Sequence, residues 1–164
     1  MKKWIWIPVF LFVLFAGDRV GGWVLESLLM KADFRYSRMY DEDHKGANLL
    51  LVGNSRGLMF FQPEIEKLTS KTTMNLSYNG LPMQMGEVLI KDYLDKFPNT
   101  KNLVLEVTMA DRLNVPLVSG FNAYSSHSKR VRDIIKENSV NSYYGAILSH
   151  LFKYNSEIFQ RGIS

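Results

Sequence analysis

The sequence contains no cysteine, and only three of its 164 residues are histidine. The absence of cysteine excludes a disulfide framework, a thiolate nucleophile, thiolate-ligated zinc and a lipid-modified N-terminal cysteine. The three histidines, His44, His127 and His150, lie far apart along the chain, which argues against a multi-histidine metal centre. We therefore expect no metal site and no cofactor.

The excess of positive charge is also small. Lys and Arg total 20 against 16 Asp and Glu, a formal net charge of +4 that is spread along the chain. This balance does not indicate a nucleic-acid partner. A basic cluster at residues 129–132 is interpreted as a solvated helix face, with contact to anionic lipid headgroups as the alternative. The length allows about one domain, and a hydrophobic content of 46% excludes a disordered chain.

The N-terminal segment is the longest apolar stretch of the chain. Residues 4–16 (WIWIPVFLFVLFA) carry no charge, and extension to residue 25 gives the roughly 20 residues that a bilayer requires. The extension includes Asp18 and Arg19, which would lie near one end of the span. We interpret residues 1–29 as a single-pass membrane anchor. A cleaved signal peptide and a buried core helix are the alternatives.

The orientation of this anchor is not fixed by its charges. Lys2 and Lys3 precede the apolar core, and Arg19, Lys31 and Arg35 follow it, so the positive charges on the two sides are nearly equal. Long domains translocate largely regardless of such charges. We expect the body of the protein on the extracytoplasmic side.

The body of the chain alternates strand and helix patterns. Residues 30–46 are polar and charged and are interpreted as a linker, so that the folded domain covers residues 47–164. Strands are predicted at 47–52, 72–78 and 102–108, and helices at 63–68 and 85–97. This order indicates an α/β fold with a parallel sheet.

Beyond the third strand the pattern changes. Residues 113–126 contain Pro116 and Gly120 and are predicted to be a loop, and helices are predicted at 128–137 and 143–159. No fourth strand is predicted. Three strands are few for an α/β domain, so we expect the sheet to be incomplete, as in a truncated form of a longer protein.

A short motif at the end of the first strand carries the chemistry. Gly53 ends the buried strand and Ser55 follows two residues later, at the sheet edge where open parallel sheets bind ligands. The Ser55 N–H would donate to a developing oxyanion, and Gly80, after the second strand, would supply a second N–H donor. A helix N-cap is the alternative for Ser55, and an ordinary turn is the alternative for Asn79-Gly80.

With these residues in place, the chain resembles the SGNH (GDSL-like) hydrolase superfamily, in particular its membrane-anchored bacterial members. Gly53-Asn54-Ser55-Arg56 matches the family's first block, and Gly80 matches the glycine of its second block. The segment Asp18-Arg19-Val20-Gly21-Gly22 is similar to the end of the anchor in such proteins. The resemblance implies a flavodoxin-like α/β domain with Ser55 as nucleophile and the N–H groups of Ser55 and Gly80 as oxyanion hole.

Two other blocks of the family are missing. Where the third block, Gly-x-Asn-Asp, is expected, residues 106–111 read EVTMAD, in which Thr108 is only a partial substitute for the asparagine. The closing Asp-x-x-His block is absent. Because serine is a weak nucleophile without a base, the three histidines are candidate replacements for the missing one, and His127, in a polar loop after the third strand, is the first of them. Asn54, Arg56, Asn79, Thr108 and His127 are therefore candidate neighbours of the site.

The resemblance implies ester hydrolysis or acyl transfer, with an acylated carbohydrate of the cell envelope as the substrate. The missing blocks favour inactivity of this short chain. The alternative function is a non-catalytic, membrane-anchored module for binding or assembly, with an envelope protein as its partner. In either case we expect the lipid bilayer to be a partner of the anchor.

Overall fold

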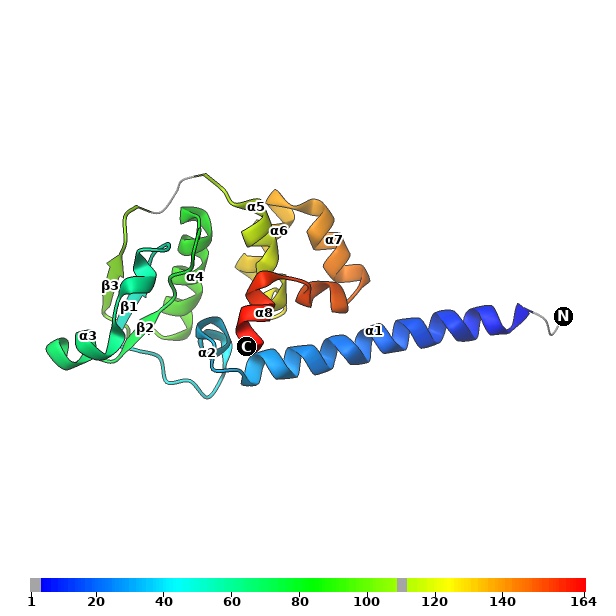
Figure 1. Cartoon of the computed structure of the whole chain (residues 1–164), viewed down its shortest axis with the longest axis horizontal. Coiled ribbons are helices and arrows are strands. Elements are labelled where there is room, and N and C mark those ends of the chain that lie inside the picture. Colours follow the sequence, from blue (N-terminus) through cyan, green and yellow to red (C-terminus); the bar gives the residue numbers. More distant parts are fainter. Residues whose placement is uncertain (1–3, 109–111) are drawn as a thin grey trace.

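The computed structural model describes residues 4–108 and 112–164 (Figure 1). The polypeptide folds, in chain order, into the following elements: α1 (Trp6–Lys31), α2 (Arg35–Tyr40), β1 (Leu49–Val52), the 3₁₀ helix η2 (Gly57–Met59), α3 (Gln62–Thr69), β2 (Thr73–Asn75), α4 (Met83–Lys96), β3 (Asn102–Leu105), α5 (Val115–Gly120), the 3₁₀ helix η3 (Phe121–Tyr124), α6 (Lys129–Asn138), α7 (Val140–Leu148), the 3₁₀ helix η4 (Leu151–Tyr154) and α8 (Glu157–Ile163).

The sheet is parallel and has the strand order β2-β1-β3. All four residues of β1 are buried, as predicted for a continuous apolar run at the centre of a covered sheet. β3 is an edge strand, and its side chains Leu103, Val104 and Leu105 are partly exposed. The predicted α/β class and the three-stranded parallel sheet are therefore confirmed.

Helix α1 is the outlying element of the fold. Its N-terminal half projects away from the body, whereas its C-terminal half passes beneath the helices of the C-terminal half of the chain (Figure 1). At about 1.5 Å per residue its 26 residues extend about 39 Å. Among the described residues it is the one helix long and apolar enough to cross a membrane. A buried core helix, one alternative for this segment, does not fit the exposure of most of its apolar side chains.

The predicted linker at residues 30–46 is only partly irregular. It contains α2, in which Tyr36, Ser37 and Met39 are buried in the core. The Tyr36 hydroxyl donates to the Leu76 carbonyl oxygen beyond β2 at 3.1 Å, and Ser37 and Tyr124 share a hydrogen bond of 2.9 Å. The predicted linker is therefore part of the folded body. The rings of Tyr36 and Tyr124 pack in the core, and their hydroxyl groups have buried hydrogen-bond partners.

The predicted loop at residues 113–126 is wrong. Most of this segment forms α5 and η3, and Val118, Phe121 and Tyr124 are fully buried. Pro116, taken as a loop signal, lies in the first turn of α5, where proline is well tolerated, and the Asn114 side chain accepts a hydrogen bond from the Leu117 N–H at 3.2 Å. The predicted helix at 143–159 is similarly divided into α7, η4 and α8.

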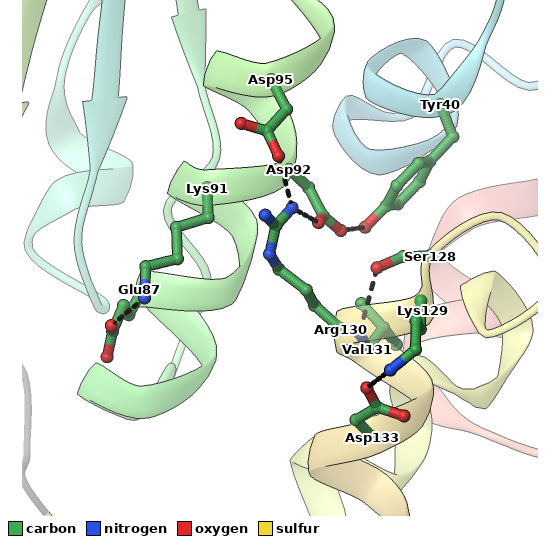
Figure 2. A network of polar contacts seen from close by, with 10 residues as sticks. All are labelled: Tyr40, Glu87, Lys91, Asp92, Asp95, Ser128, Lys129, Arg130, Val131 and Asp133. Carbon is green, nitrogen blue, oxygen red and sulfur yellow. Dashed lines mark hydrogen bonds and ion pairs between the residues drawn. The ribbon is translucent and has the colours of Figure 1, made fainter.

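A polar network joins α2, α4 and α6 (Figure 2). Asp92, whose side chain is almost buried, accepts from the Tyr40 hydroxyl at 2.9 Å and from the Arg130 guanidinium at 3.1 Å. Arg130 also pairs with Asp95 at 2.7 Å, and Lys129 pairs with Asp133 at 2.5 Å. The basic cluster at 129–132 is thus partly neutralised by acidic side chains, two of them from α4.

We expect Asp92→Ala to destabilise the fold by about 2 kcal/mol, because hydrogen bonds to charged groups are among the stronger ones and the partly buried Tyr40 hydroxyl would lose its acceptor. Glu87→Ala in the same helix removes only an exposed pair with Lys91 and should change stability much less (Figure 2). Urea denaturation of the detergent-solubilised chain compares the two. Equal stability of the two variants would contradict the network's role.

Candidate functional site

The loop from Gly53 to Gly57 lies at the carboxyl end of β1 and is packed tightly against its neighbours. A Cβ atom placed on Gly53 would come within 2.5 Å of the Glu106 Cβ, and one on Gly57 would come within 2.3 Å of the Ser77 Oγ. The Asn75 side chain of β2 donates to the Gly57 carbonyl oxygen at 2.9 Å. Gly53 and Gly57 are therefore both required in this loop by the close approach of neighbouring residues.

Within this loop Asn54, and not Ser55, has the structural role. The Asn54 Oδ1 accepts from the Arg56 N–H at 3.1 Å, and its Nδ2 donates to the Thr108 carbonyl oxygen at 2.8 Å. The N-cap position of η2 is held by Arg56, whose side chain forms no capping hydrogen bond. Ser55 is exposed and forms no hydrogen bond with the described residues. The alternative prediction, that Ser55 is a helix N-cap, is therefore wrong.

Glu106 lies behind the loop, after β3. Its Oε1 accepts from the Thr108 N–H at 2.8 Å and also from the Thr108 hydroxyl. Hydrogen bonding from the Thr108 hydroxyl holds the pKa of Glu106 below its usual range, so the group stays ionised and is a poor proton acceptor. Its Oε2 is buried without a hydrogen-bond partner among the described residues. Thr108 therefore orders the segment that follows β3. Residues 109–111, where the family's third block is expected to continue, lie outside the described residues.

Gly80 occupies a tight turn after β2. Its φ of +71° is in the left-handed region, and the Leu81 N–H donates to the Tyr78 carbonyl oxygen at 3.1 Å, which closes a turn around Asn79-Gly80. Asn79 and Gly80 also line a cavity of about 460 Å³ whose other wall comes from the C-terminal helices, including Asn114, Ser156 and Glu157. Ser55 does not line this cavity, so its predicted pairing with the Gly80 N–H remains a prediction.

The three histidines have other surroundings. His127 Nε2 is 3.0 Å from Glu26 Oε1 of α1, and its ring stacks on Tyr40. His44 precedes β1, at the opposite end of the sheet from Ser55, where burial beside Phe97 lowers its pKa. His150 contacts Gly22 of α1. No described contact connects any of these imidazoles with Ser55.

Two residues of this edge escaped the sequence analysis. Asn75 is buried in β2, where its side chain accepts from the Ser77 N–H at 2.9 Å in addition to holding the Gly57 carbonyl. Arg35 of α2 donates to the Ser77 carbonyl oxygen, and the buried Ser77 Oγ has no hydrogen-bond partner in the described part of the chain. The signal for Asn75 was an asparagine inside a strand. Nothing in the sequence pattern indicated Arg35.

Comparison with known proteins leaves the identity of this site open. No protein-family model matches the chain, and no curated protein or solved structure is significantly similar to it. The assignment of function therefore depends on the site's own chemistry.

Proposed function

We propose that this chain is a membrane-anchored, SGNH-like α/β protein of the cell envelope that binds its ligand at the Ser55 edge of the sheet without serine catalysis of its own. The observation that carries this proposal is the position of His127. His127 is the first candidate to replace the missing base, and its Nε2 lies 3.0 Å from Glu26 Oε1 of the anchor helix. A general base must come within hydrogen-bond reach of the hydroxyl that it deprotonates.

The fold and the ligand edge are supported by different features. The order β2-β1-β3 is that with which a flavodoxin-like 2-1-3-4-5 sheet begins. The free hydroxyl of Ser55 stands at the carboxyl edge of this sheet, where such folds bind ligands. Because Asn54 performs the local structural work, Ser55 is available for a ligand. By the resemblance, that ligand is an acylated carbohydrate.

The anchor and its orientation complete the proposal. Helix α1 has the length and composition of a membrane span. We place the body on the extracytoplasmic side, where an envelope carbohydrate or an envelope protein partner would be found. The interaction of α1 with the lipid bilayer is then the chain's first binding function.

A second candidate function, serine ester hydrolase or O-acyltransferase, is favoured by one observation. Ser55 is exposed and has no hydrogen-bond partner among the described residues, as expected of a nucleophile before its substrate binds, whereas the side chain of Asn54 is hydrogen-bonded.

A fluorophosphonate probe separates the two functions. We expect membranes with the wild-type chain and membranes with Ser55→Ala to give equal labelling, because an unactivated serine reacts slowly. A known serine hydrolase added to the same membranes is the positive control. Labelling that disappears only in Ser55→Ala would refute the non-catalytic proposal and support the second function, and His127→Gln would then test the base.

A further inference from the structure

The corner between α7 and η4 exposes a group of large apolar side chains. We call this group the corner patch, and it consists of Tyr144, Ile147, Leu148, Leu151 and Phe152. Leu148 is 77% exposed. In a water-soluble domain such a patch marks a surface that contacts something else. The corner lies on the side of the body toward which α1 projects (Figure 1).

The corner patch is held against one level of helix α1. Asp18 accepts from the Ser149 hydroxyl at 2.5 Å, from the His150 N–H at 2.8 Å and from the Leu151 N–H at 3.2 Å. Arg19 donates to the Leu148 carbonyl oxygen at 3.1 Å. The corner is therefore attached to α1 at Asp18 and Arg19.

Two glycines of α1 let the corner approach at the same level. A Cβ atom on Gly21 would lie 3.0 Å from Leu151, and one on Gly22 would lie 2.4 Å from the His150 Cβ. The depth of the corner in a membrane is thus set by the depth of residues 18–22 of α1.

The length of α1 fixes that depth. From Trp6 to Gly17, where the helix is free of the body, the span is about 18 Å at 1.5 Å per residue. A bilayer's hydrocarbon core is about 30 Å thick and needs about 20 residues, which from Trp6 carries it to about Leu25, past Trp23. Trp23 is exposed, as suits an aromatic side chain at a membrane interface. The membrane must then extend past the level at which the corner is attached.

From these positions we propose that the corner patch inserts into the bilayer beside α1, at the boundary between headgroups and acyl chains. The partner is lipid, and the inference rests on the membrane anchor of the proposed function. Insertion also accounts for the charged pair inside the span. Asp18 and Arg19 would be costly in hydrocarbon without partners. The corner supplies a hydroxyl and backbone N–H donors to Asp18 and a backbone carbonyl acceptor to Arg19. The second half of the chain thus completes the membrane-facing surface.

The absence of cysteine gives a direct test, because a single cysteine can be introduced and labelled with an environment-sensitive fluorophore. Leu148→Cys places the label in the corner patch. Leu68→Cys, in α3 at the far end of the body, is the matched control, since Leu68 is 75% exposed (Figure 1). Each full-length variant is reconstituted into phosphatidylcholine–phosphatidylglycerol vesicles, some of them containing lipids with a nitroxide on the upper acyl chain. Flotation of the same samples measures membrane association.

We expect the label at position 148 to show blue-shifted emission and to lose most of its intensity to the lipid nitroxide, while the label at position 68 does neither. If both variants float and the label at 148 behaves like that at 68, the corner patch is in water and the inference is overturned, although the anchor stands. If neither variant floats, the membrane anchor itself fails, and the inference fails with it.

Discussion

Gly22→Ala is expected to separate the C-terminal half of the chain from helix α1. The added Cβ would lie 2.4 Å from the His150 Cβ and 3.2 Å from the His150 carbonyl carbon, so no flexible side-chain end can move aside. Overpacking of this kind costs about 1–3 kcal/mol. We expect a fall in Tm of roughly 4–8 °C for a loss of about 2 kcal/mol in a chain of this size.

Gly17→Ala is the matched control in the same helix. A Cβ at Gly17 meets no other atom within 4 Å, and alanine favours a helix over glycine by about 1 kcal/mol. Thermal unfolding in nanodiscs should therefore place the Tm of Gly17→Ala at or above that of the wild type. If Gly22→Ala is as stable as Gly17→Ala, the corner is not docked on α1 as the structure has it.

The segment from Asp18 to Gly22 thus has a physical explanation that its position in the sequence did not suggest. Asp18 and Arg19 provide hydrogen bonds to the corner, and Gly21 and Gly22 provide the space for it. Their partners are about 130 residues away in the chain. No periodicity or spacing records a pairing over that distance, so the sequence indicated an anchor but not what the anchor holds.

The first half of the body was predicted well because its strands and helices are indicated by residues close together in the sequence. The run Leu49–Val52 needs only its own apolar residues to indicate a buried strand, and Pro63 and Pro98 bound their helices by a local steric effect. The loop predicted at 113–126 failed because Pro116 and Gly120 mark helix boundaries as well as loops. The segment is helical because Phe121 and Tyr124 are buried in the assembled core, and the local sequence does not show that burial.

The candidate site shows the same division. The sequence identified the loop at Gly53 and Ser55, and the fold places that loop at the carboxyl edge of the parallel sheet. It could not assign roles inside the loop, because the hydrogen bonds of Asn54 and Asn75 depend on strands that meet only after folding. The polar segment around His127 favours it as the base, but its partner Glu26 lies about 100 residues earlier, in α1, and no local pattern indicates that contact.

The largest effect at the candidate site is expected from Gly57→Ala, and not from Ser55→Ala. A Cβ on Gly57 would lie 2.3 Å from the Ser77 Oγ and 2.8 Å from the Ser77 Cβ, in a region where Ser77 is fully buried. We expect a loss of about 2 kcal/mol, within the range for overpacked interiors. Ser55→Ala changes an exposed side chain that has no described partner, so its Tm should equal that of the wild type.

A second substitution tests whether the predicted contact is the cause. Ser77→Gly removes both atoms that the new Cβ would meet, while the Ser77 N–H keeps its hydrogen bond to Asn75. Gly57→Ala combined with Ser77→Gly should therefore be more stable than the sum of the two single changes predicts, by about 1–2 kcal/mol of coupling for residues in contact. Strictly additive changes in a double-mutant cycle would show that the loop is not packed on Ser77. Coupling together with an inert Ser55 would mean that Gly57 is required for packing on Ser77, whereas the Ser55 side chain remains available to a ligand.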